Sequence, residues 1–262
     1  MPTTAVITIG IDPTIELGPI TLAWHGITIA LGILIGGLAA ARWLRERDLP
    51  PAPMQTFVVL AAVGGIIGAR VFYLLEHDPG ALLAPGRLIS GNGFTFDGGV
   101  ILAALLIAAY VHRTGLSARY LDAGAAGLAL GVAIGRIGDV INGEHYGERS
   151  GFLLAVRNSH PDALTPNPDY AYHSGGLYEV LLATSIFAAI WPLRHRLERP
   201  GDLAWLVLGL FAAGRFLVFF LRSDSPQLAL GLNNAQWTSV ALLAIVLVGR
   251  TLTRRRADLH QC

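Results

Sequence analysis

The sequence predicts an all-α polytopic membrane protein of about seven transmembrane helices with a small head on its outer face. Of its 262 residues, 53% are hydrophobic and 14% are charged, whereas soluble domains carry about 25% charged residues. Apolar stretches of about 20 residues, the length that crosses a bilayer as a helix, recur along the chain. The formal net charge is +1, so no global basic field indicates a nucleic-acid partner.

Each predicted span is an apolar run that ends at charged residues, glycine or proline. We interpret residues 1–262 as one integral membrane domain. The third span is short, so we expect it to tilt or to extend by a few residues. The spans lie near residues 20–42, 55–75, 97–112, 121–141, 176–193, 202–221 and 236–252.

The arginines predict the orientation of these spans. The chain contains no lysine, and its arginines gather after the first, third, fifth and seventh spans, as in "RWLRER" and "RTLTRRR". Because basic residues concentrate on the cytoplasmic side of a membrane, we expect the N-terminus outside and the C-terminus in the cytoplasm. A composition rich in Arg, Ala, Gly and Pro is typical of a high-GC bacterial genome.

The segments outside the spans lie mainly on the outer side. An N-terminal arm near residues 1–19 alternates apolar and small residues around Pro13, which is typical of a strand or an interfacial segment. An outer head near residues 143–175, rich in Pro, Asn, Tyr and Asp, is inserted between spans four and five. The loop 76–96 contains the glycine-rich stretch "GRLISGNGF", which suits turns. Cys262 is the only cysteine, which excludes an internal disulfide and a multi-cysteine metal site.

The outer end of the fourth span carries the polar segment "GRIGDVINGEHYG", residues 135–147. On a helix, Arg136 and Asp139 share a face, and Asn142 and Glu144 follow toward the outer leaflet. An arginine fork suits a phosphate oxyanion, and the abundant phosphate of a membrane is the phospholipid head group. Taken alone, the segment fits equally well a structural Arg–Asp bridge that locks helices together.

Polar side chains elsewhere in the chain gather at the same membrane face. Arg70, Arg136 and Arg215 lie inside spans or at their outer ends, where a charged side chain costs at least a few kcal/mol. This one-sided distribution favours a binding or catalytic site over scattered structural bridges. The other polar residues expected at the outer face are Trp24, His25, Asp97, His173, Tyr178, Glu179 and Arg222.

These motifs resemble the bacterial prolipoprotein diacylglyceryl transferase family over nearly the whole chain. The strongest match sets "GRIGDVINGEHYG" against a family signature of the form Gly-Arg-x-Gly-Asn-Phe-x-Asn-x-Glu-x-x-Gly. "WHGITIALGILIGG", "DGGVILAALLIAAY", "HSGGLYE" and "GRFLVFFLRSDSP" resemble further family motifs in the same order. The signature positions that agree are Gly135, Arg136, Gly138, Asn142, Glu144 and Gly147.

The chain departs from the family pattern at several of these positions. Asp97 stands where the family has a histidine, and Asp139 stands where it has an asparagine. Phe219 replaces a glutamate, and His25 takes the place of a common tyrosine. Ser174 replaces a proline. The departures therefore fall within the motifs that carry the resemblance.

The resemblance implies transfer of the diacylglyceryl group of phosphatidylglycerol to the thiol of the lipobox cysteine of prolipoproteins, with release of glycerol phosphate. The implied partners are phosphatidylglycerol, the prolipoprotein signal peptide and membrane lipid, and the reaction requires no cofactor and no metal. The catalytic candidates are Asp97, Arg136, Glu144 and Arg215. The substrate-binding candidates are His25, Arg136, Asp139, Asn142, Gly147, Tyr178 and Arg222.

Roles for these residues follow from the resemblance and from the chemistry. Arg136 and Arg215 are expected to stabilise the phosphate charge of the transition state, while Asn142 and Glu144 orient the glycerol head or hold the arginines. A base near the thiol is also needed. The resemblance places it at Asp97, and the alternative positions are His25, His145 and His173.

Two other classes of function stay open. One is a catalytically impaired or repurposed relative that binds phospholipid or lipoprotein, or that transfers to another thiol acceptor. The other is a solute transporter, which would predict ionisable groups near mid-membrane and broken helices in both halves of the chain. The polar groups of this chain crowd the outer ends of the spans, which favours the transferase over the transporter.

Overall fold

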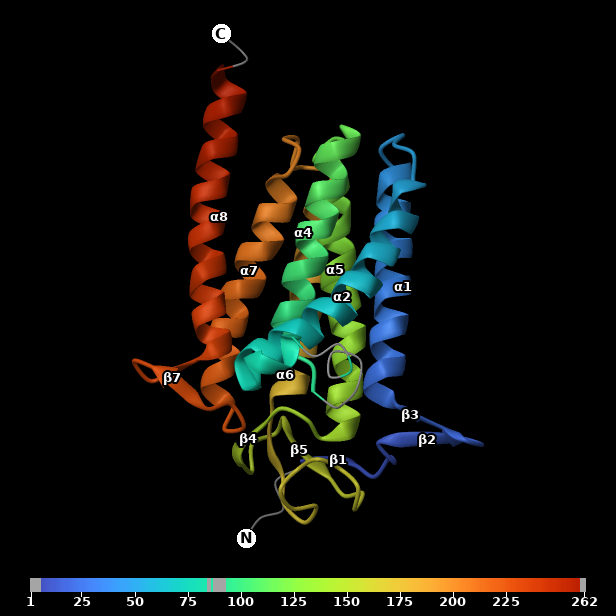
Figure 1. Cartoon of the computed structure of the whole chain (residues 1–262), viewed down its shortest axis with the longest axis vertical. Coiled ribbons are helices and arrows are strands. Elements are labelled where there is room, and N and C mark those ends of the chain that lie inside the picture. The colour runs from blue at the N-terminus through green and yellow to red at the C-terminus, as the bar shows by residue number, and fades with distance from the viewer. Residues whose placement is uncertain (1–5, 84–85, 87–92, 260–262) are drawn as a thin grey trace.

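The computed structural model describes residues 6–83, 86 and 93–259. Within this part of the chain, seven helices are long and apolar enough to cross a membrane, as the sequence predicts. Figure 1 shows most of them standing roughly along one axis, with residues 7–9 near one end of the bundle and the last helix ending at the other. The helices are α1 (Trp24–Arg45), α2 (Pro53–His77), α4 (Phe96–Thr114), α5 (Arg119–Asn142), α6 (Gly175–Leu193), α7 (Asp202–Val218) and α8 (Asn234–Leu259).

Short strands gather at one end of the bundle, which we call the head end. A four-stranded sheet has the order β1-β5-β6-β4, in which β1 pairs in parallel with β5 and the other pairs are antiparallel. Two hairpins, β2–β3 and β7–β8, flank it. The strands are β1 (Ile7–Ile9), β2 (Thr14–Leu17), β3 (Ile20–Ala23), β4 (Tyr146–Arg149), β5 (Ala155–Asn158), β6 (Tyr172–Ser174), β7 (Gln227–Ala229) and β8 (Leu232–Asn233).

Several predicted helix bounds differ from the observed ones. The first helix begins at Trp24 and not near residue 20, because Ile20–Ala23 pairs with Thr14–Leu17 as a hairpin. The last helix continues past residue 252 to Leu259. Two short 3-10 helices, η1 (Pro79–Leu83) and η2 (Phe219–Leu221), follow α2 and α7. Residues 87–92 of the glycine-rich loop, together with Cys262, lie outside the described residues.

The closest helix contact joins α1 to α5 through glycine. A Cβ atom added to Gly36 would lie 2.4 Å from the carbonyl oxygen of Gly127, and one added to Gly32 would lie 2.3 Å from that of Gly131. Small residues at these positions let two membrane helices approach backbone to backbone. The contact fixes α1 against the helix that carries the polar segment of the sequence.

The apolar core lies mainly at the end opposite the head. Trp43, Leu44, Ile190 and Leu203 are almost fully buried there. The core is closed by Asp122 of α5, which accepts hydrogen bonds from the backbone N–H groups of residues 201 and 204 at the start of α7, both at 2.9 Å. This packing leaves the head end of α5, α6 and α7 free to hold polar side chains.

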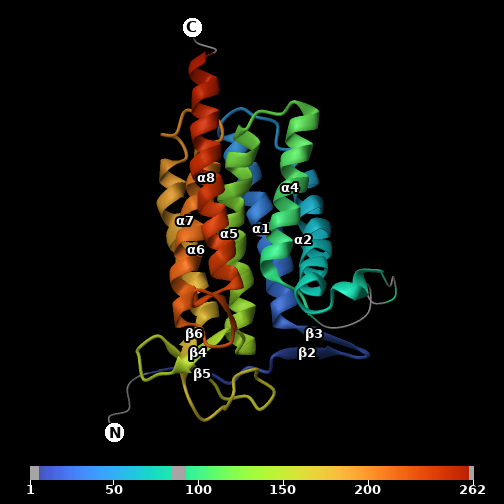
Figure 2. The same ribbon diagram turned by 60° about the vertical axis from the view of Figure 1, so that its left-hand side comes forward.

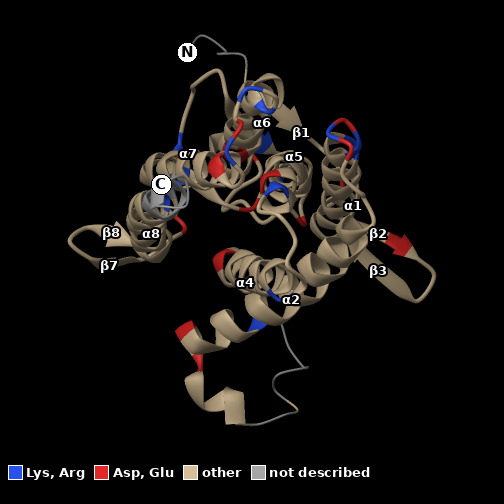
Figure 3. Cartoon of the chain, turned by 90° about the horizontal axis from the view of Figure 1, so that it is seen from above, with Lys and Arg blue, Asp and Glu red and all other residues tan. Residues whose placement is uncertain are grey.

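The remaining helices pack at the periphery. The α2 and α4 helices lie side by side and contact the rest of the bundle less than they contact each other (Figure 2), and α8 packs mainly on α7. Figure 3, viewed along the bundle, shows that pair set apart from α5, α6 and α7, with most of the helix surface free of charged residues. A surface of this kind suits contact with lipid.

Candidate active site

The last two turns of α5 form the base of the candidate site. Arg136 and Asp139 are 4% and 0% exposed, and Arg136 Nη1 donates a hydrogen bond to Asp139 Oδ2 one turn away. Asn142 closes the helix and is also buried. Gly143 then adopts a left-handed conformation, with φ of +74°, which ends the helix. The chain therefore turns back and brings Glu144 and His145 over the end of α5.

A row of alternating charges runs from α5 across α6 and α7 to α4. Glu179 of α6 is 1% exposed and lies between two arginines: Arg136 Nε is 2.5 Å from its Oε2, and Arg215 Nη1 is 3.2 Å from its Oε1. Arg215 Nη2 is in turn 2.9 Å from Asp97 Oδ1 at the start of α4. Buried charges are tolerated when they are paired in this way.

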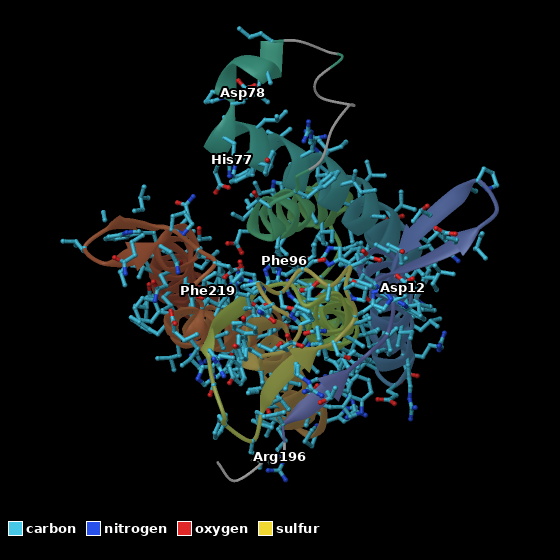
Figure 4. The ribbon with its side chains drawn as sticks, turned by 90° about the horizontal axis from the view of Figure 1, so that it is seen from below. Asp12, His77, Asp78, Phe96, Arg196 and Phe219 are labelled. Atoms are coloured by element: carbon cyan, nitrogen blue, oxygen red, sulfur yellow. The ribbon has the colours of Figure 1, made fainter. Side chains whose placement is uncertain are left out.

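Aromatic rings cover both guanidinium groups. The ring of Phe96 lies 4.1 Å from the guanidinium carbon of Arg136 and 4.9 Å from that of Arg215. Phe219 lies between two arginines, 4.9 Å from Arg215 and 4.3 Å from Arg222. Figure 4, viewed from the head end, shows Phe96 and Phe219 near the middle of the bundle. The rings exclude water, and their faces stabilise the cations.

A second branch of the site joins α1 to the end of α5. The Nδ1 atom of His25 forms a hydrogen bond with Asp139 Oδ1 and lies 3.7 Å from Glu144 Oε2. Asn142 donates its side-chain N–H to Glu144 Oε1 at 2.8 Å. Among the described residues, the buried Oδ1 atom of Asn142 has no hydrogen-bond partner. It is therefore an acceptor suited to a ligand hydroxyl group.

The segment after α7 adds a third group of charges. Arg222 donates two hydrogen bonds to Asp224, at 2.7 and 2.8 Å, and its Nη2 lies 2.9 Å from His145 Nδ1. His145 Nε2 is 3.5 Å from Asp139 Oδ2, which links this group to α5. Burial alone would raise the pKa of Asp224, but hydrogen bonds with His145 and Arg222 outweigh it and hold the pKa at about 2.

Three residues singled out from the sequence lie at the margin of this cluster. The hydroxyl group of Tyr178 is 2.5 Å from His173 Nδ1. Gly147 allows β4 to approach η2, because a Cβ atom there would lie 1.8 Å from the carbonyl oxygen of Leu221. Arg70 donates to the carbonyl oxygen of Gly93 at 3.2 Å, in the connection between α2 and α4.

The structure thus brings together side chains from five segments, in agreement with the polar face that the sequence predicts. His25, Asp97, Arg136, Asp139, Asn142, Glu144, Arg215 and Arg222 belong to this cluster. The residue that joins its two arginines, Glu179, had been noted only for its position. A carboxylate at the end of an apolar span requires a buried cation as its partner, and this requirement is the sequence signal that could have identified its role.

The cluster also has to be considered as a metal site. One ligand atom from each of His25, Asp139 and Glu144 lies within 4.8 Å of the others. However, both oxygens of Asp139 already accept hydrogen bonds, one from Arg136 and one from His25. A cation would have to displace these two donors, so the arrangement favours a hydrogen-bonded ion-pair cluster over a metal centre.

Comparison with known proteins adds independent evidence. Residues 13–251 match the family model described as prolipoprotein diacylglyceryl transferase. Three similar proteins carry the name phosphatidylglycerol–prolipoprotein diacylglyceryl transferase. The protein of Dehalococcoides mccartyi is 29% identical over 95% of this chain and 98% of its own length. That of Streptococcus agalactiae is 30% identical over 94% and 96%, and that of Rhizobium meliloti is 30% identical over 91% and 90%.

Proposed function

The chain belongs to the prolipoprotein diacylglyceryl transferase family and is a multi-pass membrane transferase, and from this premise we propose its reaction. It transfers the diacylglyceryl group of phosphatidylglycerol to the thiol of the lipobox cysteine of a prolipoprotein. The carbon–oxygen bond to the phosphate breaks, a carbon–sulfur bond forms, and glycerol phosphate leaves. The substrates are those that the names of the relatives state.

The pair of buried guanidinium groups around Glu179 supports this proposal most directly. Arg136 engages Glu179 and Asp139 through Nε and Nη1, and Arg215 engages Glu179 and Asp97 through its two Nη atoms. Because a guanidinium group has five N–H donors, each arginine retains donors for a phosphate oxygen. Donors fixed in a water-poor site stabilise the charge that develops on the leaving phosphate.

Neighbouring side chains would position the rest of the lipid head group. Asn142 offers its buried Oδ1 to a glycerol hydroxyl group, and Glu144 holds the amide of Asn142 in place. Arg222, Tyr178 and the other substrate-binding candidates would line the approach. Gly147 contributes by letting the head strands pack closely against η2.

The membrane arrangement follows the arginine distribution. We place the head end outside the bacterial inner membrane and the C-terminus in the cytoplasm, which agrees with β1 and the last turn of α8 lying at opposite ends of the bundle. The arm near residues 1–19 and the head near 143–175 then form one outer unit, because β1 pairs with β5. Phosphatidylglycerol of the outer leaflet and the signal peptide would both reach the site from this side.

The test uses the purified full chain in phosphatidylglycerol liposomes with a lipobox peptide. The expected products are a peptide with the added mass of diacylglycerol less water and an equal amount of glycerol phosphate. Arg136→Lys keeps the charge but loses the planar fork, so its turnover should fall at least tenfold, whereas Arg149→Ala on the exposed face of β4 is the control. A folded wild-type chain that yields neither product would contradict the proposal.

A lipid-binding relative without turnover is the second candidate. It is favoured by one observation: Asp97, at the position of the expected base, is bound to Arg215. In that case the chain would retain phosphatidylglycerol through purification and the peptide would stay unmodified. The same liposome experiment distinguishes this candidate from the transferase.

A further inference from the structure

We propose that His25, held by Asp139, is the general base that removes the proton from the acceptor thiol. The inference rests on the proposed transferase function and assigns the one role that the residues around the two arginines leave open. Two observations support it. The imidazole of His25 forms a hydrogen bond with a buried carboxylate, and the other candidate bases are already engaged by neighbouring side chains.

The hydrogen bond fixes which nitrogen of His25 carries a proton. Asp139 is fully buried, and Arg136 pairs with one of its oxygens, which keeps the carboxylate ionised. An ionised carboxylate can only accept hydrogen bonds, so the hydrogen of the contact belongs to His25 Nδ1. In the neutral ring, Nε2 then carries the lone pair. Since the side chain of His25 is 37% exposed, that lone pair is accessible to a substrate thiol.

The backbone also holds His25 in place. A Cβ atom at Gly138 would lie 2.5 Å from the Cα atom of His25, so only glycine lets α1 approach α5 this closely. One turn further along α1, Thr28 donates its hydroxyl hydrogen to the carbonyl oxygen of Gly135 at 2.8 Å. A base built on two packed helices keeps its orientation better than one on a loop.

The other candidate bases are engaged in ways that do not suit the role. The charge of Asp97 neutralises Arg215, so a proton on Asp97 would break that ion pair. Both ring nitrogens of His145 face charged side chains: Nδ1 lies 2.9 Å from Arg222 Nη2 and 3.5 Å from Asp224 Oδ2, and Nε2 lies 3.5 Å from Asp139 Oδ2. Neither nitrogen is therefore open to a thiol. His173 contacts the neutral hydroxyl group of Tyr178 and is not oriented by a carboxylate in that contact.

The proton balance of the step is simple. His25 Nε2 takes the thiol hydrogen as sulfur attacks the diacylglyceryl carbon, and the electrons of the broken carbon–oxygen bond leave with glycerol phosphate. The imidazolium that forms is stabilised by Asp139 and Glu144 and opposed by Arg136, the charged groups that face it from α5 and the turn after it. It then returns its proton to solvent or to the departing phosphate.

The test measures the pH dependence of turnover for His25→Ala and His25→Gln in phosphatidylglycerol liposomes. At pH 7 a cysteine thiol, with an ordinary pKa of about 8.5, is mostly protonated, and loss of a general base should lower kcat by about 100-fold or more. Above pH 9 the thiol ionises by itself, so the deficit should shrink at least tenfold. Added imidazole should partly restore His25→Ala at pH 7.

A purely structural role for His25 predicts a deficit that is the same at every pH and is not rescued by imidazole. Either variant with wild-type turnover at pH 7, or a pH-independent loss in both folded variants, would overturn the inference. Loss of wild-type turnover on adding EDTA would also overturn it, because His25 would then serve a metal. Failure of the wild-type chain to form the diacylglyceryl peptide would instead refute the proposed function.

Discussion

Neutralising Glu179 tests the central feature of the site. Its carboxylate is 1% exposed and contacts both Arg136 and Arg215. Glu179→Gln keeps the size of the side chain but leaves two buried guanidinium groups with one carboxylate fewer between them. Removing one partner of a buried ion pair costs about 3–5 kcal/mol. We therefore expect the free energy of unfolding to fall by about that amount.

The same substitution should change the response of the protein to anions. With Glu179 neutral, the two guanidinium groups carry an excess positive charge that a phosphate can compensate. A ligand present at about 100 times its dissociation constant stabilises the folded state by about 2.7 kcal/mol. Inorganic phosphate should therefore recover more stability in Glu179→Gln than it adds to the wild type.

Unfolding by sodium dodecyl sulfate in mixed micelles, with and without phosphate, measures both effects. Glu148→Gln is the matched control, because Glu148 lies exposed on β4 and carries the same chemical change. If Glu179→Gln unfolds like this control and phosphate acts equally on both, the assignment of Glu179 as the carboxylate that holds the two arginines together is wrong.

Three further expectations concern pH and packing. Ionised Asp224, with a pKa of about 2, stabilises the folded chain above about pH 4, and this stabilisation is lost as the pH falls toward 2. In an acid titration followed by tryptophan fluorescence, Asp224→Asn should therefore lose less stability between about pH 4 and about pH 2 than the wild type does. Gly36→Leu forces a side chain against the carbonyl oxygen of Gly127 and should lower the monodisperse fraction in size-exclusion chromatography, whereas Gly65→Leu, which meets open space, should not. Phe219→Ala should cost about 3–5 kcal/mol in detergent unfolding; Phe219→Leu should cost less, and equal losses would contradict a contribution from apolar volume.

The spans could be predicted from the sequence because a bilayer imposes a length and a polarity on each helix. The run near 55–75 became Pro53–His77, for example. The start of α1 was less predictable: Ile20–Ala23 is as apolar as the helix that follows, and only its pairing with residues 14–17 makes it a strand. The pairing of residues 7–9 with residues 156–158 is equally hard to predict from the sequence, because it joins two segments that are far apart along the chain.

The candidate site shows the same division between local and distant information. The contact between Arg136 and Asp139 follows from their spacing on one helix. The pairing of Arg215 with Asp97 cannot be predicted in this way, because the local sequence does not determine which helices pack against each other. The full row of three carboxylates and two arginines, which includes Asp139 and Glu179, could therefore be recognised only from the three-dimensional arrangement. Even so, the gathering of these side chains at one end of the bundle was predictable from the distribution of polar residues along the sequence.

The glycine contact between α1 and α5 has a consequence for biosynthesis. Gly36 and Gly127 meet backbone to backbone, yet about 90 residues of chain separate them, which a ribosome needs on the order of 5–20 s to synthesise. During that interval α1 lies in the bilayer without its packing partner, and its glycine face contacts lipid or the insertion machinery. The α2 and α4 helices pack on each other as neighbours and can pair meanwhile. Emergence of α5 is therefore the event that assembles the two halves of the site, and a chain that stalls before it leaves His25 without its carboxylate.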